Sequence, residues 1–207
     1  MLMATNRGNE ANFLLKQALE SRVNDLNLRA YYTHFLIQSN LHSHALKFVH
    51  ATLQISKSDL YGTCAVGWLH YHLGRETRST NEETTRDRRH KFKAAAEFYD
   101  KALSLDPGCS VAAQGLAIMI AEDALGVMSV KSSSAAVEDE DTRMKNTRDA
   151  LDVFAKIREV LADGSVYTNM GHCYYMRDEY ERAIESVSVY RKNLLHEAQC
   201  TNSMKQA

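Results

Sequence analysis

Histidine is the residue type in this chain whose spacing comes closest to a chemical site. Two His-x-His pairs, His42/His44 and His70/His72, resemble metal-ligand pairs. Residues two apart on a helix point in different directions, so His70 and His72 cannot easily share one ion. His42 and His44 have no carboxylate or cysteine near them in sequence. We therefore expect all four to be surface histidines and predict no metal site.

A nucleophilic site is not indicated either. His172 and Cys173 are adjacent, but neighbouring residues on a helix diverge, so they do not form a catalytic pair. The sequence has no Gly-rich phosphate loop, no H-E-x-x-H and no G-x-S-x-G motif. We therefore predict a protein that is not an enzyme, carries no cofactor and takes no small-molecule substrate.

Charge and cysteine usage narrow the class of protein further. A formal net charge of -1 gives no reason to expect direct nucleic-acid binding or attraction to a membrane. The four cysteines are widely spaced without a C-x-x-C pair, which excludes a zinc knuckle and suits a reducing compartment. The first residues lack the apolar run of a signal peptide, and the longest apolar stretches are shorter than a membrane span.

The elements that would position any site are repeated helix pairs. Residues 91–125, KFKAAAEFYDKALSLDPGCSVAAQGLAIMIAEDAL, predict a helix, a stop at Pro107 and a second helix. This order is typical of the tetratricopeptide repeat (TPR), in which paired helices stack with a period of about 34 residues. First helices are then expected to start at Leu26, Leu60, Ser110 and Gly164.

The same register gives each repeat a small residue where its two helices cross. In the second helices these residues are Ala11, Ala45, Ala95, Ala150 and Ala183. In the first helices they are Thr33, Gly67, Ala117 and Gly171. Four residues after each alanine stands the larger packing residue, namely Leu15, Val49, Tyr99, Phe154 and Val187. We therefore predict an all-α fold, a right-handed TPR superhelix of about eight or nine helices.

The domain boundaries follow from this register. Residues 1–25 form the N-terminal helix of a partial repeat, residues 26–197 the TPR solenoid, and residues 198–207 a disordered tail. Spacings longer than one period place inserts at about 75–90 and 126–148. The first insert has mixed charge, which predicts a solvated loop or helix extension, and the second is Ser-rich and then acidic, which predicts disorder. Beyond Ser186 the repeat pattern is lost, and we expect that the tail is not the native continuation.

Protein partners are expected in the groove that the first helices of TPR repeats line. The candidate partner-binding residues are Asn27, His34, Gln38, Tyr61, Trp68, Tyr71, His72, His172 and Tyr175. Tyr61, Trp68 and Tyr71 supply the aromatic side chains that dominate many interfaces. The alternative is that these residues pack against the neighbouring repeat. The groove lacks the cations that would hold the acidic C-terminus of a chaperone.

Some residues match a known family beyond what TPR packing demands. They lie in residues 91–125, for example AQGLAIMIAEDAL (residues 113–125), and in NTRDALDVFAKIREVLADGSVYTNMGHCYYMRDEYERAIES (residues 146–186). The segment LRAYYTHFLIQSN (residues 28–40) fits the same family. From about Asn24 to Ser186 the chain resembles the large TPR scaffold subunit of the RNA polymerase II-associated factor (PAF) complex, in a fungal-type version. The resemblance implies a non-catalytic nuclear scaffold. Its partners would be other PAF-complex subunits and RNA polymerase II machinery, and its role would lie in transcription elongation and histone modification. The alternatives are an unrelated cytosolic TPR adaptor, or a TPR appendage of an enzyme whose catalytic part lies elsewhere.

Overall fold

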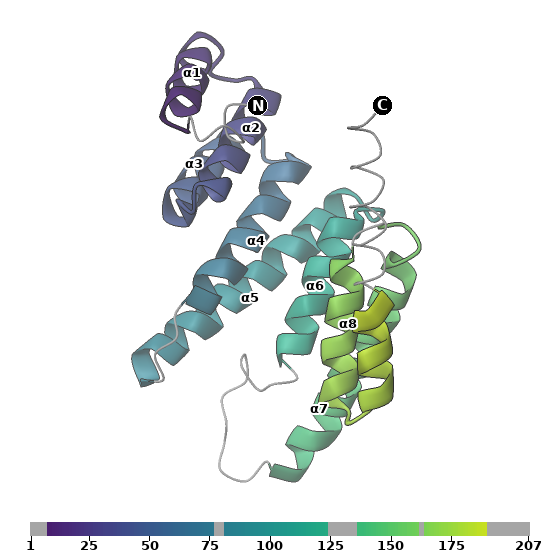
Figure 1. Ribbon diagram of the computed structural model, residues 1–207. Helices are drawn as coiled ribbons and strands as arrows, with labels where there is room; N and C mark the ends of the chain where they lie inside the picture. The colour runs from purple at the N-terminus through teal and green to yellow at the C-terminus, as the bar shows by residue number, and fades with distance from the viewer. Residues whose placement is uncertain (1–7, 77–80, 124–135, 162–163, 190–207) are drawn as a thin grey trace, which may run out of the picture. The chain divides into compact units, whose positions relative to one another are not determined.

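The computed structural model describes residues 8–76, 81–123, 136–161 and 164–189, and all regular structure there is helical (Figure 1). It divides into two compact units, residues 1–107 and 108–207. The first contains α1 (Gly8–Ser21), α2 (Leu26–Gln38), α3 (His42–Ile55), α4 (Leu60–Glu76) and α5 (Glu82–Leu105). The second contains α6 (Ser110–Asp123), α7 (Ala136–Ile157), α8 (Ser165–Met176) and a helix over residues 180–189. The predicted all-α fold is confirmed.

The helix starts follow the predicted register, and side-chain caps fix those of α2 and α4. α2, α4 and α6 begin at the expected residues, and α8 begins one residue after Gly164, which is its N-cap. The Asp25 carboxylate accepts a hydrogen bond from the Leu28 amide at 3.1 Å, and Asp59 does the same for the Gly62 amide at 3.1 Å. Each satisfies a backbone donor that the first helical turn leaves unpaired.

The predicted crossing residues are buried in both units. Ala45 and Ala95 are fully buried in the first unit, and Ala117 and Ala150 in the second. In the first unit α4 and α5 lie side by side (Figure 1), and a Cβ at Gly67 would stand 3.0 Å from the Tyr99 ring. The small size of the residues at these crossings lets the bulky partners fill the space between helices.

In the second unit, α7 and α8 show the same packing of bulky residues against small ones. Phe154 is fully buried beside Ala117 and Val166. A Cβ at Gly171 would stand 2.9 Å from Cγ2 of Val187 and 3.3 Å from the Ala183 carbonyl oxygen, so the helix over residues 180–189 lies tightly on α8. Val187 nevertheless stays exposed over much of its surface, unlike Tyr99 and Phe154 at the matching position.

The two inserts are more helical than the sequence indicated. Residues 82–90 of the first insert form the start of α5, the helix extension that was one of the two expectations. The predicted disorder of the second insert is wrong for residues 136–148, because α7 begins at Ala136. Thr147 in this helix is fully buried, and its hydroxyl donates a hydrogen bond to the Arg143 carbonyl at 2.9 Å, so the insert contributes to the packed interior. Residues 126–135 and the tail over 198–207 lie outside the described residues.

In the described part of the chain, no helix has the length and apolarity needed to cross a bilayer.

Close packing at the helix crossings predicts that a larger residue in place of a crossing alanine destabilises the first unit. Ala45→Leu adds three carbons at a fully buried site in α3, and we expect a loss of about 2 kcal/mol or more in the free energy of unfolding. Urea denaturation followed by circular dichroism measures this loss. Ala51→Leu is the matched control, because Ala51 is exposed on the same helix and should change stability by less than about 0.5 kcal/mol. Equal stability of the two variants would contradict the proposed packing.

Candidate partner-binding surface

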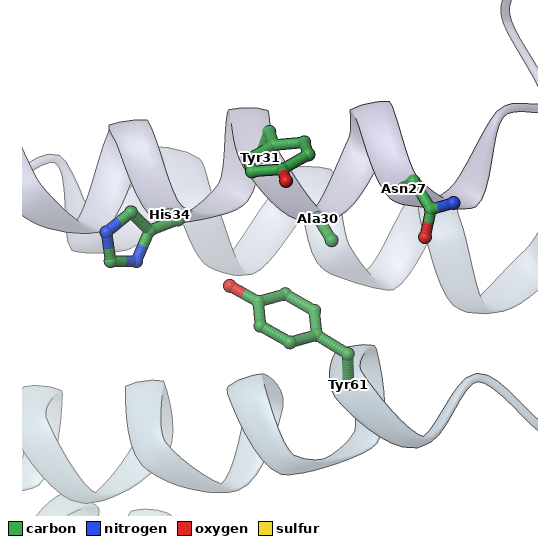
Figure 2. Close-up of a pocket in the computed structure, with 5 residues that line it drawn as sticks. All are labelled: Asn27, Ala30, Tyr31, His34 and Tyr61. Carbon is green, nitrogen blue, oxygen red and sulfur yellow. The ribbon is translucent and has the colours of Figure 1, made fainter. Parts of the chain in front are cut away.

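A pocket of about 530 Å³ lies between α2 and α4 in the first unit, and we call it the α2/α4 pocket (Figure 2). Its lining residues are Asn27, Ala30, Tyr31, His34 and Tyr61. Figure 2 shows the Tyr61 ring rising from α4 toward α2, between Asn27 and His34. Tyr31 is 70% exposed and Tyr61 43% exposed, so both rings are accessible to a partner.

Helical periodicity places these residues together. Asn27, Ala30, Tyr31 and His34 recur at spacings of three and four, so they share one face of α2. Its other face carries buried Leu36 and faces the core, which orients the helix. On α4, the Asp59 cap sets the first turn in which Tyr61 stands.

The α2/α4 pocket is lined by aromatic and polar side chains. Burial, and then the charge of Asp59, raise the pKa of the Tyr61 phenol, which therefore remains protonated and can donate a hydrogen bond. Asn27 offers an amide and His34 an imidazole, while Ala30 leaves room beside the two rings. Lysine and arginine are absent from the lining, among the described residues, so a partner would be held by aromatic contact and hydrogen bonds.

Three of the sequence-predicted residues, Asn27, His34 and Tyr61, thus meet in one pocket. Gln38 is exposed one turn beyond His34, on the same face of α2 but outside the lining. Tyr31 also lines the pocket, although it was not among the candidate residues. Its position in the repeat register, on the same groove-facing side of the first helix as Ala30, could have identified it.

Trp68 and His72 lie elsewhere, in a cluster that joins α4 to the start of α3. Their rings stack with centroids 3.7 Å apart and planes 30° apart, and the His42 ring meets the Trp68 ring edge-on at 5.7 Å. His42 Nδ1 lies 2.6 Å from Oε1 of Glu76, a salt bridge when the imidazole is protonated. Stacking and ion pairing therefore tie the two helices together through side chains that are distant in sequence.

The expectation of four surface histidines is wrong in three cases. His44 is exposed, but His42, His70 and His72 are each partly buried in ring contacts. The residues near His42 in sequence include no carboxylate. Its partner Glu76 belongs to α4, which only folding brings close to His42.

Tyr71 faces α5 rather than the α2/α4 pocket. Its ring lies 5.5 Å from that of Phe92, and the Arg75 guanidinium carbon stands 5.5 Å from its centroid. Tyr61 therefore lies apart from Trp68 and Tyr71, whose rings both contact that of His72. In the second unit, His172 is exposed, and the exposed Tyr175 ring meets that of Tyr180 at 5.6 Å.

Cys173, the cysteine next to His172, is buried in the second unit. Burial raises the pKa of the Cys173 thiol to about 12, despite the opposing charge of Arg177, so a reactive thiolate does not form at neutral pH. Within the described ranges, no three His, Cys, Asp or Glu side chains gather to ligate a metal ion.

Fold and surface together define the class of protein. Among solved structures, the chain matches TTC0263, a thermophilic TPR protein of Thermus thermophilus, with a TM-score of 0.63 over 94% of each chain at 13% identity. It matches the crystal structure of MamA with a TM-score of 0.55, over 96% of this chain and 95% of that one, at 12% identity. The fold is therefore that of a TPR protein.

Sequence comparison finds individual proteins that are similar to this chain. The chain is 26% identical over 188 residues to the RNA polymerase-associated protein CTR9 of Saccharomyces cerevisiae, across 88% of its own length. It is 23% identical over 188 residues to tetratricopeptide repeat protein 1 of Schizosaccharomyces pombe, across 89% of its length. The chain spans only 16% of the length of either relative. No protein-family model matches it. The comparisons support a TPR scaffold with a protein-interaction role.

The partly buried histidines predict that acidification destabilises the first unit. Burial is the main cause that lowers the pKa of His70, aided by His50, His90 and Lys91. The pKa of His72 is also lowered, by burial, His42 and Arg75 against the opposing charge of Glu76. The unfolded chain, with histidine pKa values near about 6.5, then binds more protons than the folded one just below that pH. Stability should be fully present above about pH 6.5 and fall as the pH decreases through this window.

Urea denaturation at about pH 7.5 and about pH 5.5 tests this sign. His70→Phe keeps a ring against Phe98 and removes the titrating group, whose buried Nδ1 lacks a hydrogen-bond partner in the described structure. This variant should lose less stability on acidification than the wild type. His44→Phe, at an exposed position, should behave as the wild type does. An unchanged pH response in His70→Phe would show that His70 does not contribute.

Proposed function

We propose that this chain is a segment of a non-catalytic nuclear scaffold in the PAF complex. In this role it binds other PAF-complex subunits and RNA polymerase II machinery and thereby assists transcription elongation and histone modification. The observation that carries the proposal is the similarity to yeast RNA polymerase-associated protein CTR9, which extends over 88% of the chain. A match of this extent covers most of the helices on which the predicted groove residues stand, rather than one short motif.

The α2/α4 pocket supplies the binding mechanism. An extended partner segment would place an apolar or aromatic side chain between the Tyr31 and Tyr61 rings, over the space that Ala30 leaves open. Asn27 and His34 would hydrogen-bond to its backbone from the two ends of the pocket (Figure 2). Exposed tyrosines suit this role because they contribute a large contact area and lose little conformational freedom.

The remaining candidates divide by their surroundings. Gln38, His172 and Tyr175 are exposed and are proposed as further contacts for partners. Trp68, Tyr71 and His72 contact residues of α3 and α5, so their proposed part in binding is to fix α4 and with it Tyr61. Replacing Trp68 or Tyr71 would disturb packing as well as binding, and Tyr61 is therefore the cleaner probe.

Affinity purification of the tagged chain from the cells that produce it tests the proposal. We expect mass spectrometry to recover RNA polymerase II and other PAF-complex subunits. The double variant Tyr61→Ala/His34→Ala should reduce this recovery about tenfold, because removing an anchoring aromatic side chain commonly costs more than about 1 kcal/mol. Phe13→Ala is the control, since Phe13 is exposed on α1 and lies outside the pocket.

Other outcomes would replace the proposal. Chaperones or membrane machinery in place of polymerase would indicate an unrelated TPR adaptor. A linked catalytic activity would indicate an appendage of an enzyme. Unchanged recovery with the double variant, confirmed as folded by circular dichroism, would move the interface away from the α2/α4 pocket.

A further inference from the structure

A second hollow, on the other side of α2, has features that the α2/α4 pocket lacks. It has a volume of about 510 Å³ and is bounded by α1, α2 and α3, and we call it the α1/α3 groove. Its α2 residues, Tyr32 and Leu36, lie between about 100° and about 180° around the helix from Asn27 and Tyr31 of the α2/α4 pocket. The two sites therefore use different faces of one helix and can be occupied independently.

The floor of the α1/α3 groove is apolar and rigidly built. Tyr32 and Leu36 are buried, and the Phe48 ring meets Tyr32 edge-on with centroids 4.9 Å apart. The Tyr32 hydroxyl donates a hydrogen bond to Oδ1 of Asn12 at 3.2 Å, which joins the α1 wall to the floor. Leu41, at the turn before α3, remains 43% exposed and offers an apolar contact at the edge.

The rim of this groove is basic. Lys16 on α1 and His44 and Lys47 on α3 line it with their side chains accessible, while no carboxylate belongs to the lining within the described residues. Neither lysine forms an ion pair in the described part of the chain. From Leu26 to Ser58 the sequence contains no Asp or Glu, although the chain as a whole has 26 acidic and 25 basic residues. His44 and Lys47 thus have no acidic residue near them in sequence, whereas Lys16 has Glu20 one turn along α1.

We infer that the α1/α3 groove binds an acidic peptide segment that carries one bulky apolar side chain. The apolar side chain would rest on Phe48 and Leu41, and flanking carboxylates would pair with Lys16 and Lys47. Nucleic acid is a poorer fit, because a phosphate backbone needs a dense row of cations and gains little from a buried apolar floor. This inference does not depend on membership of the PAF complex or on the α2/α4 pocket.

A fluorescence-anisotropy titration of the full chain tests the inference. The probe is a pool of labelled peptides of about eight residues, with Leu or Phe at one central position and Asp or Glu at the others. We expect saturable binding that weakens as salt rises from about 50 mM to about 500 mM, because the contacts are at the surface and are screened. A matched pool with Asn and Gln in place of the acids should bind roughly tenfold more weakly.

Variants locate the binding. Lys16→Glu/Lys47→Glu should weaken binding of the acidic pool roughly tenfold or more, since two attractions become repulsions. Lys57→Glu makes the same replacement at one exposed lysine outside the groove and should have little effect. Leu41→Asn keeps every charge and should weaken binding several-fold through loss of the apolar contact. Tyr61→Ala should leave this binding unchanged, which separates a failure here from a failure of the proposed function.

Several results would overturn the inference. They are the absence of saturable binding, equal binding of the neutral pool, and full binding by the folded double-lysine variant. A loss with Lys57→Glu as large as that with the double-lysine variant would also overturn it. An oligouridylate that binds more tightly than the acidic pool, and is lost in the double-lysine variant, would make the groove a nucleic-acid surface instead.

Discussion

The close approach of paired helices at small residues is the constraint on which the rest of the structure depends. Gly67 has no side chain where the Tyr99 ring packs, and Gly171 none where residues 183 and 187 pack. Ala45, Ala95 and Ala150 repeat this arrangement with full burial. Because interiors are close-packed, larger residues at these crossings would push the helices apart and displace the surfaces on either side. Helix positions, and therefore the pocket and groove, follow from the size of these residues.

A single helix, α2, contributes residues to two different surfaces. α2 has a buried stripe that includes Leu36 and an exposed stripe that includes Tyr31. The exposed stripe meets Tyr61 of α4 in a neutral pocket, while the edge of the buried stripe forms the floor of a groove with a basic rim. The lining of the first is aromatic and polar, and that of the second is apolar with lysines at its edge. The proposed binding roles rest on this difference between the two faces of α2.

The histidine-rich segment around α3 shows the limit of reading residues by their neighbours in sequence. His42, His70 and His72 looked like solvent-exposed residues because nearby sequence offered no partner. Their contacts with Trp68, Phe98 and Glu76 come from stacking of successive helices. The same stacking buries His70 and His72 in part. Burial disfavours the protonated form of each imidazole and lowers its pKa, and the stability of the first unit therefore depends on pH.

The sequence by itself determined the helix register, because the alternation of small and bulky residues and the stop at Pro107 are local signals. Three first helices start where it predicted, and Asn27, His34 and Tyr61 came from the same register. Tertiary structure decided the features that short stretches of sequence do not encode. It showed that Tyr71 faces α5, that residues 136–148 are helical, and that Lys16 and Lys47 share a groove. The first and the last of these depend on contacts between segments far apart in the chain, which only the packing of helices brings together.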